Sequence, residues 1–560
     1  MEKYYSLGID FGTNSVRTLV VDLQTGEEIA TESIDYRSGE HGILLDRRQP
    51  HLARQHPGDY AVSLKKAVRL TMEKVLESGI SPTEIRGIGI DGTGSSPLPV
   101  DETLTPLALQ KKFHHNLNAQ TWLWKDHTAA DEAREITELA AELHPEYLKK
   151  CGEAYSSEWF FSKIFHCYRI DRDVFDAAHS WIELSDYLPA LLCGHKNINQ
   201  LKRNVCAAGH KAMFNETWGG LPSEDFLRKL SPDLAQLRKR LYQKAYSSDE
   251  IAGFLTKEWS ENLQLPEGIP VAVGALDAHF GAVGSGVGKG ILIKIIGTST
   301  CDIMVYPDDG KLQDIPGVAG IVRGSVLPGY LGIEAGQSAV GDIFNWFVTQ
   351  VLNREADYHQ ILSEKASQLK AGESGLLALD WNNGNRNILT DPHLSGLLLG
   401  QTLLTSDYEI YRALIEATAF GARRIIEQME QYGVKIEKVI NCGGIAEKNP
   451  LVMQIYADAL GRPMETARSA QTVALGAAIF GGLVGLKNVK GFETVEKIQD
   501  RVCKVKDKIY YPRKDQQKIY DQLYTLYKKI HDGFGIATNQ ENMYRIMKNL
   551  LEIKKSTTMA

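Results

Sequence analysis

An aspartate and a turn of small residues lie together near the start of the chain, where Asp10 ends an apolar, strand-like segment. The turn at residues 11–15 contains Gly, Thr, Asn and Ser, and its backbone N–H groups can face a phosphate. By itself the pattern fits a hairpin turn with a solvated aspartate equally well. A second small, hydroxyl-rich turn follows a buried strand at residues 297–300, and two such turns can hold a nucleotide triphosphate from both sides. The residues assigned to the phosphates are Gly12, Thr13, Asn14, Ser15, Arg17, Gly297, Thr298 and Ser299.

A second aspartate, Asp277, lies between the apolar segment 271–276 and a small-residue segment that begins at Ala278. A carboxylate at the junction of a strand and a helix can project into a cleft while the strand fixes its position. An aspartate at a helix start is also a common N-cap, so both interpretations stay open at this point. His279, two residues further on, is interpreted as a packing or surface residue rather than as a catalytic group.

Paired glycines at 443–444 follow an apolar segment and precede a helical pattern. The absence of two Cβ atoms would let a flat group such as an adenine ring lie on the backbone there. Ordinary strand-to-helix turns also use glycine, and the small residues at 476–478 fit tight helix packing as well as a nucleotide site. The nucleotide interpretation assigns Gly443, Gly444 and Asn449 to the site.

Two better-known nucleotide motifs are excluded by their spacing. The glycine-rich segment 284–290 departs from the P-loop pattern in both spacing and last residue, and is interpreted as a flexible connector. Gly87, Gly89 and Gly92 satisfy G-x-G-x-x-G, but they lie inside a strand pattern and a proline at position 97 opposes the helix that must follow. A dinucleotide-binding fold is therefore not predicted.

The composition is that of a folded globular protein, since 43% of the 560 residues are hydrophobic and 24% are charged. The formal net charge of −7 and the lack of a long basic run argue against a nucleic-acid partner. The seven cysteines include no C-x-x-C pair, which argues against a zinc site and a disulfide framework. The N-terminus has no signal-peptide pattern and no apolar stretch is long enough for a membrane span, so the sequence predicts a cytoplasmic protein.

Strand-like and helical patterns alternate along the chain, which is typical of an α/β protein. The first half shows three short strands, a helix and a buried strand, and the second half repeats this order. We therefore predict two related domains, residues 1–286 and 287–560, with a large insertion at about 100–250 in the first domain and a helical tail at the C-terminus. The main elements are expected at residues 7–9, 16–22, 29–34, 56–77 and 85–90, and again at 291–296, 302–306, 406–431 and from 439.

These motifs, in this order over residues 5–530, resemble those of the FGGY carbohydrate kinases. The resemblance rests on the turns at 10–13 and 297–299, on the acid Asp277 and on the glycines at 443–444. Within that family the chain is most similar to the group of bacterial ribulokinases. The segments that carry this finer likeness are 124–128, 155–160, 208–211, 218–222, 297–302 and 334–338.

The resemblance implies two actin-like, ribonuclease H-type domains with ATP and sugar in the cleft between them. It implies MgATP as the phosphoryl donor, Asp10 near Mg²⁺ through water, and Asp277 as the base. Two positions, His166 and Gln401, differ from residues that family members often carry there. They leave the phosphate turns intact, so kinase activity is still expected.

The expected reaction is phosphorylation of the ketopentose ribulose, L-ribulose to L-ribulose 5-phosphate in arabinose catabolism, with the sugar and MgATP as partners. Another pentulose or pentitol kinase such as a xylulokinase, an actin-like or chaperone-like ATPase and an inactive sugar sensor are the alternatives. The oligomeric state is left open, a homodimer included. The residues expected around the sugar are Ser95, Ser96, Asp126, Lys211, Asp277 and Glu334.

Overall fold

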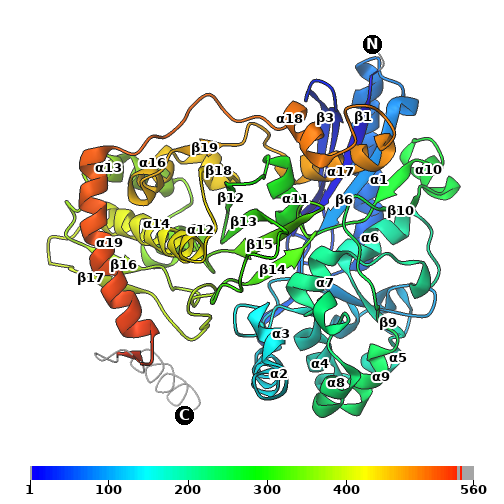
Figure 1. The fold of residues 1–560 in the computed structure, drawn as a ribbon, viewed down its shortest axis with the longest axis horizontal. Coiled ribbons are helices and arrows are strands. Elements are labelled where there is room, and N and C mark those ends of the chain that lie inside the picture. Colours follow the sequence, from blue (N-terminus) through cyan, green and yellow to red (C-terminus); the bar gives the residue numbers. More distant parts are fainter. Residues whose placement is uncertain (1–2, 539–542, 545–560) are drawn as a thin grey trace.

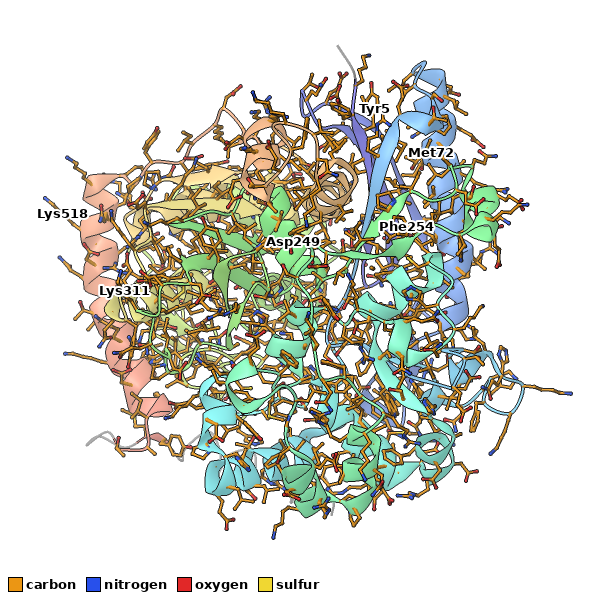
Figure 2. All side chains as sticks on the ribbon, turned by 45° about the vertical axis from the view of Figure 1, so that its right-hand side comes forward. Tyr5, Met72, Asp249, Phe254, Lys311 and Lys518 are labelled. Atoms are coloured by element: carbon orange, nitrogen blue, oxygen red, sulfur yellow. The ribbon has the colours of Figure 1, made fainter. Side chains whose placement is uncertain are left out.

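The computed structural model describes residues 3–538 and 543–544, and its largest elements are two six-stranded mixed sheets. Figure 1 shows the sheets side by side, with the N-terminal one at the right and the C-terminal one at the centre and left. Helix α1, which carries the buried Met72, and helix α19, which carries the exposed Lys518, lie on opposite sides of the molecule (Figure 2).

The first sheet has the strand order β10-β11-β6-β1-β2-β3. Every residue of β1 is buried, as expected for a central strand that is covered on both faces. Helix α1 packs on this sheet with Tyr60, Leu64 and Val68, which recur at helical spacing. The bounds are β1 Tyr5–Phe11, β2 Ser15–Asp22, β3 Glu28–Asp35, α1 Pro57–Glu77, β6 Ile85–Gly92, β10 Ile251–Phe254, α10 Lys257–Leu263 and β11 Pro270–Ala272.

The second sheet has the order β14-β15-β13-β12-β18-β19 and repeats the pairing of the first. Strand β12 pairs antiparallel with β13 and parallel with β18, as β1 pairs with β2 and β6. The duplication predicted from the order of elements is therefore confirmed. The bounds are β12 Ile291–Ile296, β13 Thr300–Pro307, β14 Gly320–Arg323, β15 Tyr330–Ala335, β18 Lys438–Cys442 and β19 Met464–Thr466.

The insertion in the first half is mainly helical and has a core of its own, built around Trp122, Trp181 and Phe161. It lies below the first sheet in Figure 1. Strands β4 Leu44–Asp46 and β5 Gln49–Gln55 precede the insertion in the chain and form a small sheet with its strand β8. The elements of the insertion are β7 Pro97–Val100, β8 Thr121–Trp122, α2 Ala130–Leu143, α3 Pro145–Lys149, α4 Phe160–Ile170, α5 Arg172–Ala177, β9 Ser180–Glu183, α6 Leu184–Leu192, α7 Val205–Lys211, α8 Glu224–Leu230 and α9 Pro232–Arg238.

Helices cover the second sheet, and the long α14 is buried against it along much of its length. No helix in the described part of the chain combines the length and apolar composition needed to cross a membrane. The remaining elements are α11 Asp277–Gly284, α12 Gly341–Trp346, α13 Tyr358–Ser367, β16 Leu377–Leu379, β17 Leu397–Leu399, α14 Asp407–Gln431, α15 Gly444–Lys448, α16 Pro450–Leu460, α17 Thr472–Leu486, α18 Val495–Val502 and α19 Lys514–Gly535.

Helix α17 comes from the last fifth of the chain but packs on the first sheet, backbone against backbone. A Cβ atom at Gly89 would lie 1.7 Å from the carbonyl oxygen of Ala477, and one at Gly87 would lie 1.8 Å from that of Gly481. Only glycine fits such a contact. A Cβ at Gly476 would lie 1.9 Å from the Phe280 carbonyl oxygen, so the small residues at 476–478 serve tight packing. The domain boundary near residue 286 stays a prediction.

Candidate active site

Two buried aspartates meet where the central strands of the first sheet end. The parallel register of β1 and β6 places Asp10 opposite Asp91, and the antiparallel register of β1 and β2 places Arg17 beside Asp10. The Arg17 guanidinium donates to Asp10 Oδ2 at 3.1 Å, and neither carboxylate oxygen of Asp91 has a hydrogen-bond partner within the protein. Two acidic side chains are thus buried together with one cation at their edge.

Burial has a large effect on these two carboxyl groups. Burial raises the pKa of Asp10, although the charge of Arg17 opposes this rise. Burial and the charge of Asp10 together raise the pKa of Asp91 well above its usual range. Carboxylates that repel each other away from water are stabilised by an added cation. The oxygen donors and the orphaned Asp91 oxygens therefore fit a hard divalent cation that keeps part of its water shell.

The turn after β1 is held by side chains from distant segments. Trp124 Nε1 donates to Thr13 Oγ1 at 3.0 Å, and Gln55 Nε2 donates to the Thr13 carbonyl at 2.6 Å. Within the turn, the Gly12 N–H donates to the Ser15 carbonyl at 3.0 Å. Strand β5 and the insertion together therefore fix the shape of the first predicted phosphate turn.

The turn after β12 is the equivalent feature of the second sheet. The Thr298 carbonyl accepts from the N–H groups of Val340 and Asp342 at 2.8 and 3.1 Å, which ties the turn to the start of α12. Lys125 follows Trp124 in the insertion, and its charge interacts with that of Asp342. Burial lowers the pKa of Lys125, and the charge of Asp342 opposes that shift. The regions of the two predicted phosphate turns thus approach each other.

Asp277 is the first residue of α11, and the N-cap position is taken by Leu276, which makes no side-chain cap. Asp277 Oδ1 accepts from the N–H of Ala278 at 2.8 Å. Burial, and after it the charge of Asp10, raises the pKa of Asp277 to about 7, while Lys211 lowers it. A carboxylate with this pKa is suited to accept a proton near neutral pH, which is the property that the cleft interpretation requires.

A cavity of about 990 Å³ lies beside the second sheet and contains three of the predicted nucleotide residues, Gly297, Gly444 and Asn449. The two glycines at 443–444 differ in role. Gly443 has φ +92° and its Cβ would lie 2.6 Å from the Ile296 carbonyl oxygen, whereas a Cβ on Gly444 would meet nothing within 4 Å. Gly444 therefore leaves open space at the cavity, and Gly443 is required by the chain itself.

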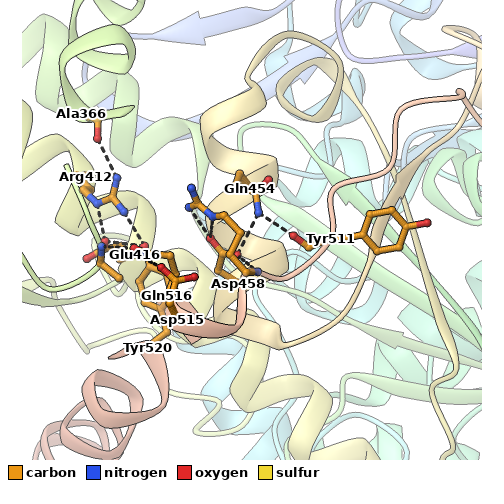
Figure 3. A network of polar contacts seen from close by, with 11 residues as sticks. Ala366, Arg412, Glu416, Gln454, Asp458, Tyr511, Asp515, Gln516 and Tyr520 are labelled. Atoms are coloured by element: carbon orange, nitrogen blue, oxygen red, sulfur yellow. Dashed lines mark hydrogen bonds and ion pairs between the residues drawn. The ribbon is translucent and has the colours of Figure 1, made fainter. Parts of the chain in front are cut away.

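The wall of this cavity is braced by the C-terminal helix (Figure 3). Arg412 donates to Glu416 at 2.8 Å and to the Tyr520 hydroxyl, on α19, at 2.9 Å. On the same wall, Arg513 pairs with Asp458 at 2.7 Å. These contacts fix helices α14 and α16 to the segment that follows residue 510.

Lys211 and Glu334, which come from the two halves of the chain, meet in a nearly buried ion pair. Lys211 Nζ donates to Glu334 Oε1 at 2.7 Å, and the two side chains are 8% and 10% exposed. Burial alone would raise the pKa of Glu334, but Lys211 holds it well below its usual range. The pair is therefore ionised at neutral pH, as the predicted sugar residues would require.

Three other residues predicted for the sugar are engaged elsewhere. Asp126 is 0% exposed and forms an ion pair with Arg54, which gives it a structural role in the insertion. Its assignment to the sugar stays a prediction. The Ser95 hydroxyl is bound by Glu183, and the Ser96 hydroxyl lies 2.9 Å from that of Thr93. Both serines are buried, and each hydroxyl has a hydrogen-bond partner within the protein. Their assignment to the sugar stays a prediction.

Comparison with known sequences decides the family. The sequence models for the FGGY family of carbohydrate kinases match residues 5–284 with the N-terminal domain and residues 292–484 with the C-terminal domain. The chain belongs to the FGGY family of carbohydrate kinases. FGGY kinases use ATP, so membership of this family implies a nucleotide and a carbohydrate as substrates.

Full-length relatives support the same family. A ribulokinase from Bacillus licheniformis is 40% identical and covers 98% of this chain and 100% of its own, and one from Halalkalibacterium halodurans is 39% identical over 99% and 98%. The solved xylulose kinase from Rhodospirillum rubrum has a TM-score of 0.74 at 20% identity, covering 95% of this chain and 99% of that chain. The predicted α/β fold with two actin-like, ribonuclease H-type domains is thereby confirmed.

The sequence reasoning missed two groups of this FGGY kinase site. Asp91 was placed at a strand end, but only the parallel pairing with β1 shows that it faces Asp10. Glu183, at the end of β9, binds both Ser95 and the Ser96 N–H, and burial raises its pKa to about 7. Asp91 could have been found from its position beside Asp10, whereas no local pattern marks Glu183.

Proposed function

We propose that this FGGY kinase transfers the γ-phosphoryl group of ATP to a hydroxyl of ribulose, yielding L-ribulose 5-phosphate from L-ribulose in the cytoplasm. The observation that carries the proposal is the position of Asp277, whose pKa responds both to Asp10 on the phosphate side and to Lys211 on the sugar side. A base between the two sides is what phosphoryl transfer to an alcohol requires. The full-length likeness to ribulokinases supports ribulose as the acceptor.

In the proposed mechanism the ATP phosphates lie between the turns after β1 and β12, and the adenosine occupies the cavity beside Gly444. Asp10 and Asp91 would hold Mg²⁺, largely through its water, and the ion would neutralise charge on the phosphate oxygens. Lys211 and Glu334 orient the sugar by donating to and accepting from its hydroxyls. Asp277 takes the proton of the attacking hydroxyl as the bond to the γ-phosphorus forms and the bond from that phosphorus to the β,γ-bridging oxygen breaks, so that ADP leaves. The proposed phosphate contacts are Gly12, Thr13, Asn14, Ser15, Arg17, Gly297, Thr298 and Ser299, and Gly443, Gly444 and Asn449 would flank the base and ribose.

The experiment that tests the proposal is an ADP-release assay with the purified protein. The panel contains both enantiomers of ribulose and of xylulose, ribitol, arabitol, glycerol and a no-sugar control. The largest kcat/KM is expected with L-ribulose, and ADP release without sugar should be negligible. A preference for xylulose or a pentitol would mean that this compound, and not ribulose, is the acceptor. Turnover without sugar would favour the ATPase alternative.

Removal of the Lys211 ammonium is expected to weaken sugar binding selectively. Lys211→Ala should raise the KM for ribulose about tenfold or more, because a hydrogen bond to a charged group is lost, and should leave the KM for ATP within about threefold. Thermal unfolding of the variant should be measured beside the kinetics, since Glu334 is left without its cation. Lys150→Ala, which breaks a more exposed ion pair with Asp314, is the matched control. An unchanged ribulose KM would remove Lys211 from the sugar site.

The pH dependence of turnover should follow Asp277, whose pKa is raised to about 7. Only the ionised form accepts a proton, so kcat/KM should fall about tenfold per unit as the pH drops below that value. A cation beside Asp10 would lower this pKa, so the acid limb should move to lower pH as free Mg²⁺ increases. Profiles of kcat/KM at two Mg²⁺ concentrations check this, and two coincident limbs near pH 4 would contradict it.

A further inference from the structure

Two histidines lie side by side behind the Glu334 carboxylate. His210 Nδ1 and His279 Nε2 are 3.4 and 3.6 Å from Glu334 Oε2, and the two rings are 4.6 Å apart between centroids. Both side chains are essentially buried, at 0% and 1% exposure. Glu334 Oε2, His210 Nδ1 and both nitrogens of His279 have no hydrogen bond within 3.5 Å, although all four atoms are removed from water. Such groups require an explanation.

The protons of this cluster can be assigned from its contacts. Ser325 Oγ donates to the Val322 carbonyl at 3.1 Å, so it must accept from His210 Nε2, which lies 3.0 Å away. Burial lowers the pKa of His210 well below its usual range and that of His279 to about 4, so both rings are neutral at pH 7. A neutral ring has one N–H, and His210 therefore turns a lone pair toward Glu334. The ring N–H that remains to donate to Glu334 Oε2 is that of His279.

The cluster also offers the donor set of a divalent-cation site, two imidazoles and a carboxylate. The charge around it opposes that use. Lys211 already neutralises Glu334 at 2.7 Å, so a bound dication would face an ammonium group in a region without water. Positioning of the carboxylate is the use that the charges allow.

We propose that His279 is a positioning residue of the sugar site. Its Nε2–H faces Glu334 Oε2 and holds the carboxylate, and the contacts of His210 and Ser325 determine that His279 is the donor. The inference rests on the proposed role of Glu334 as a sugar ligand. Lys211 and His279 then hold one oxygen each, and the carboxylate plane is fixed before the sugar arrives. The long 3.6 Å separation is expected to shorten in the sugar complex, as such contacts often do. His279 lies two residues after Asp277 on α11, so one short helix supplies both the base and the support for the acceptor site.

The test compares two substitutions of His279 that differ in one N–H. His279→Gln places an amide N–H near the position of Nε2, whereas His279→Leu has similar bulk and no donor. His279→Leu should raise the KM for L-ribulose about tenfold and leave that for ATP within about twofold, and His279→Gln should restore the ribulose KM to within about threefold of wild type. A purely structural role predicts equal changes for both substrates and no rescue by Gln.

A second variant keeps the inference falsifiable if His279→Leu does not fold. Ser325→Ala frees His210 to change tautomer, and should raise the ribulose KM by about two- to fivefold without affecting that for ATP. An unchanged ribulose KM in a folded His279→Leu, or in Ser325→Ala if His279→Leu does not fold, would overturn the inference while leaving the kinase assignment intact. Stoichiometric zinc in the purified wild-type protein, lost in His279→Gln, would overturn it in favour of a metal site. Failure of the proposed function is distinct, because the wild-type enzyme would then not phosphorylate ribulose.

Discussion

Replacement of Asp277 by Asn is expected to lower kcat by about 10² or more, while ATP and ribulose still bind within a few fold of wild type. An alcohol is a poor nucleophile at neutral pH, and a positioned carboxylate accelerates transfer by taking its proton. Asn has nearly the same shape as Asp and no basicity. The pKa of Asp277, raised to about 7, matches the working pH of such a base.

Steady-state kinetics and calorimetric titration with each ligand decide whether Asp277 is the base. A capping role would predict nearly normal turnover, because Asn caps helices about as well as Asp. In the structure the N-cap of α11 is Leu276, and Asp277 Oδ1 accepts from the Ala278 N–H at 2.8 Å. Asp500→Asn, on the exposed side of α18, is the matched control for the chemical change. A kcat of Asp277→Asn within about threefold of wild type would refute the base assignment.

Replacement of Asp126 by Ala is expected to lower the free energy of unfolding by about 3–5 kcal/mol, because it leaves the buried Arg54 without its counter-ion. Both side chains are 0% exposed, and Arg54 lies over the Trp122 ring at 3.4 Å. Asp126 also accepts from the Ala53 N–H at 2.7 Å. Burial acts to raise the pKa of Asp126, but the charge of Arg54 counteracts it, and the pKa lies below its usual value. The stabilisation is therefore present at neutral pH and is lost as the pH falls through that lowered pKa.

Urea denaturation of Asp126→Ala and of the double variant Arg54→Met, Asp126→Ala measures the effect. The double variant should regain part of the lost stability, since the charge left unpaired by the first change is removed. The ribulose KM of the folded Asp126→Ala enzyme should stay within about threefold of wild type. A tenfold rise in KM with unchanged stability would return Asp126 to the sugar site.

The sequence predicted the strands and helices that repeat between the halves, because each carries its own periodicity. Residues 291–296 form β12 with those bounds, and residues 406–431 form α14 almost as expected. The strand expected at 271–276 ends earlier, at Ala272, since Gly274 passes the Ser185 carbonyl so closely that a Cβ would lie 2.2 Å from it. Such a contact depends on a segment 89 residues away and leaves no local pattern.

Site residues were predictable where a turn follows a strand and not where distant segments meet. Asp10 lies near the end of β1 and Asp277 is the first residue of α11, and both positions follow apolar segments that a sequence displays. The motif around Asp126 reveals a polar group but not the Arg54 partner that takes its charge. The role of His279 beside Glu334 depends on α11 and β15 coming together, and no spacing within either segment indicates it.

The contact of α17 with the first sheet determines how this enzyme could be taken apart. A fragment that ended near residue 286 would contain Asp10, Asp91 and Asp277 and would still lack the helix that lies on Gly87 and Gly89. The bare face of its central strands would be exposed to water, and the fragment should aggregate rather than fold. An autonomous half would have to carry residues 472–486 as a grafted segment, because the helix that covers the strands of the buried aspartates is encoded about 200 or more residues after them.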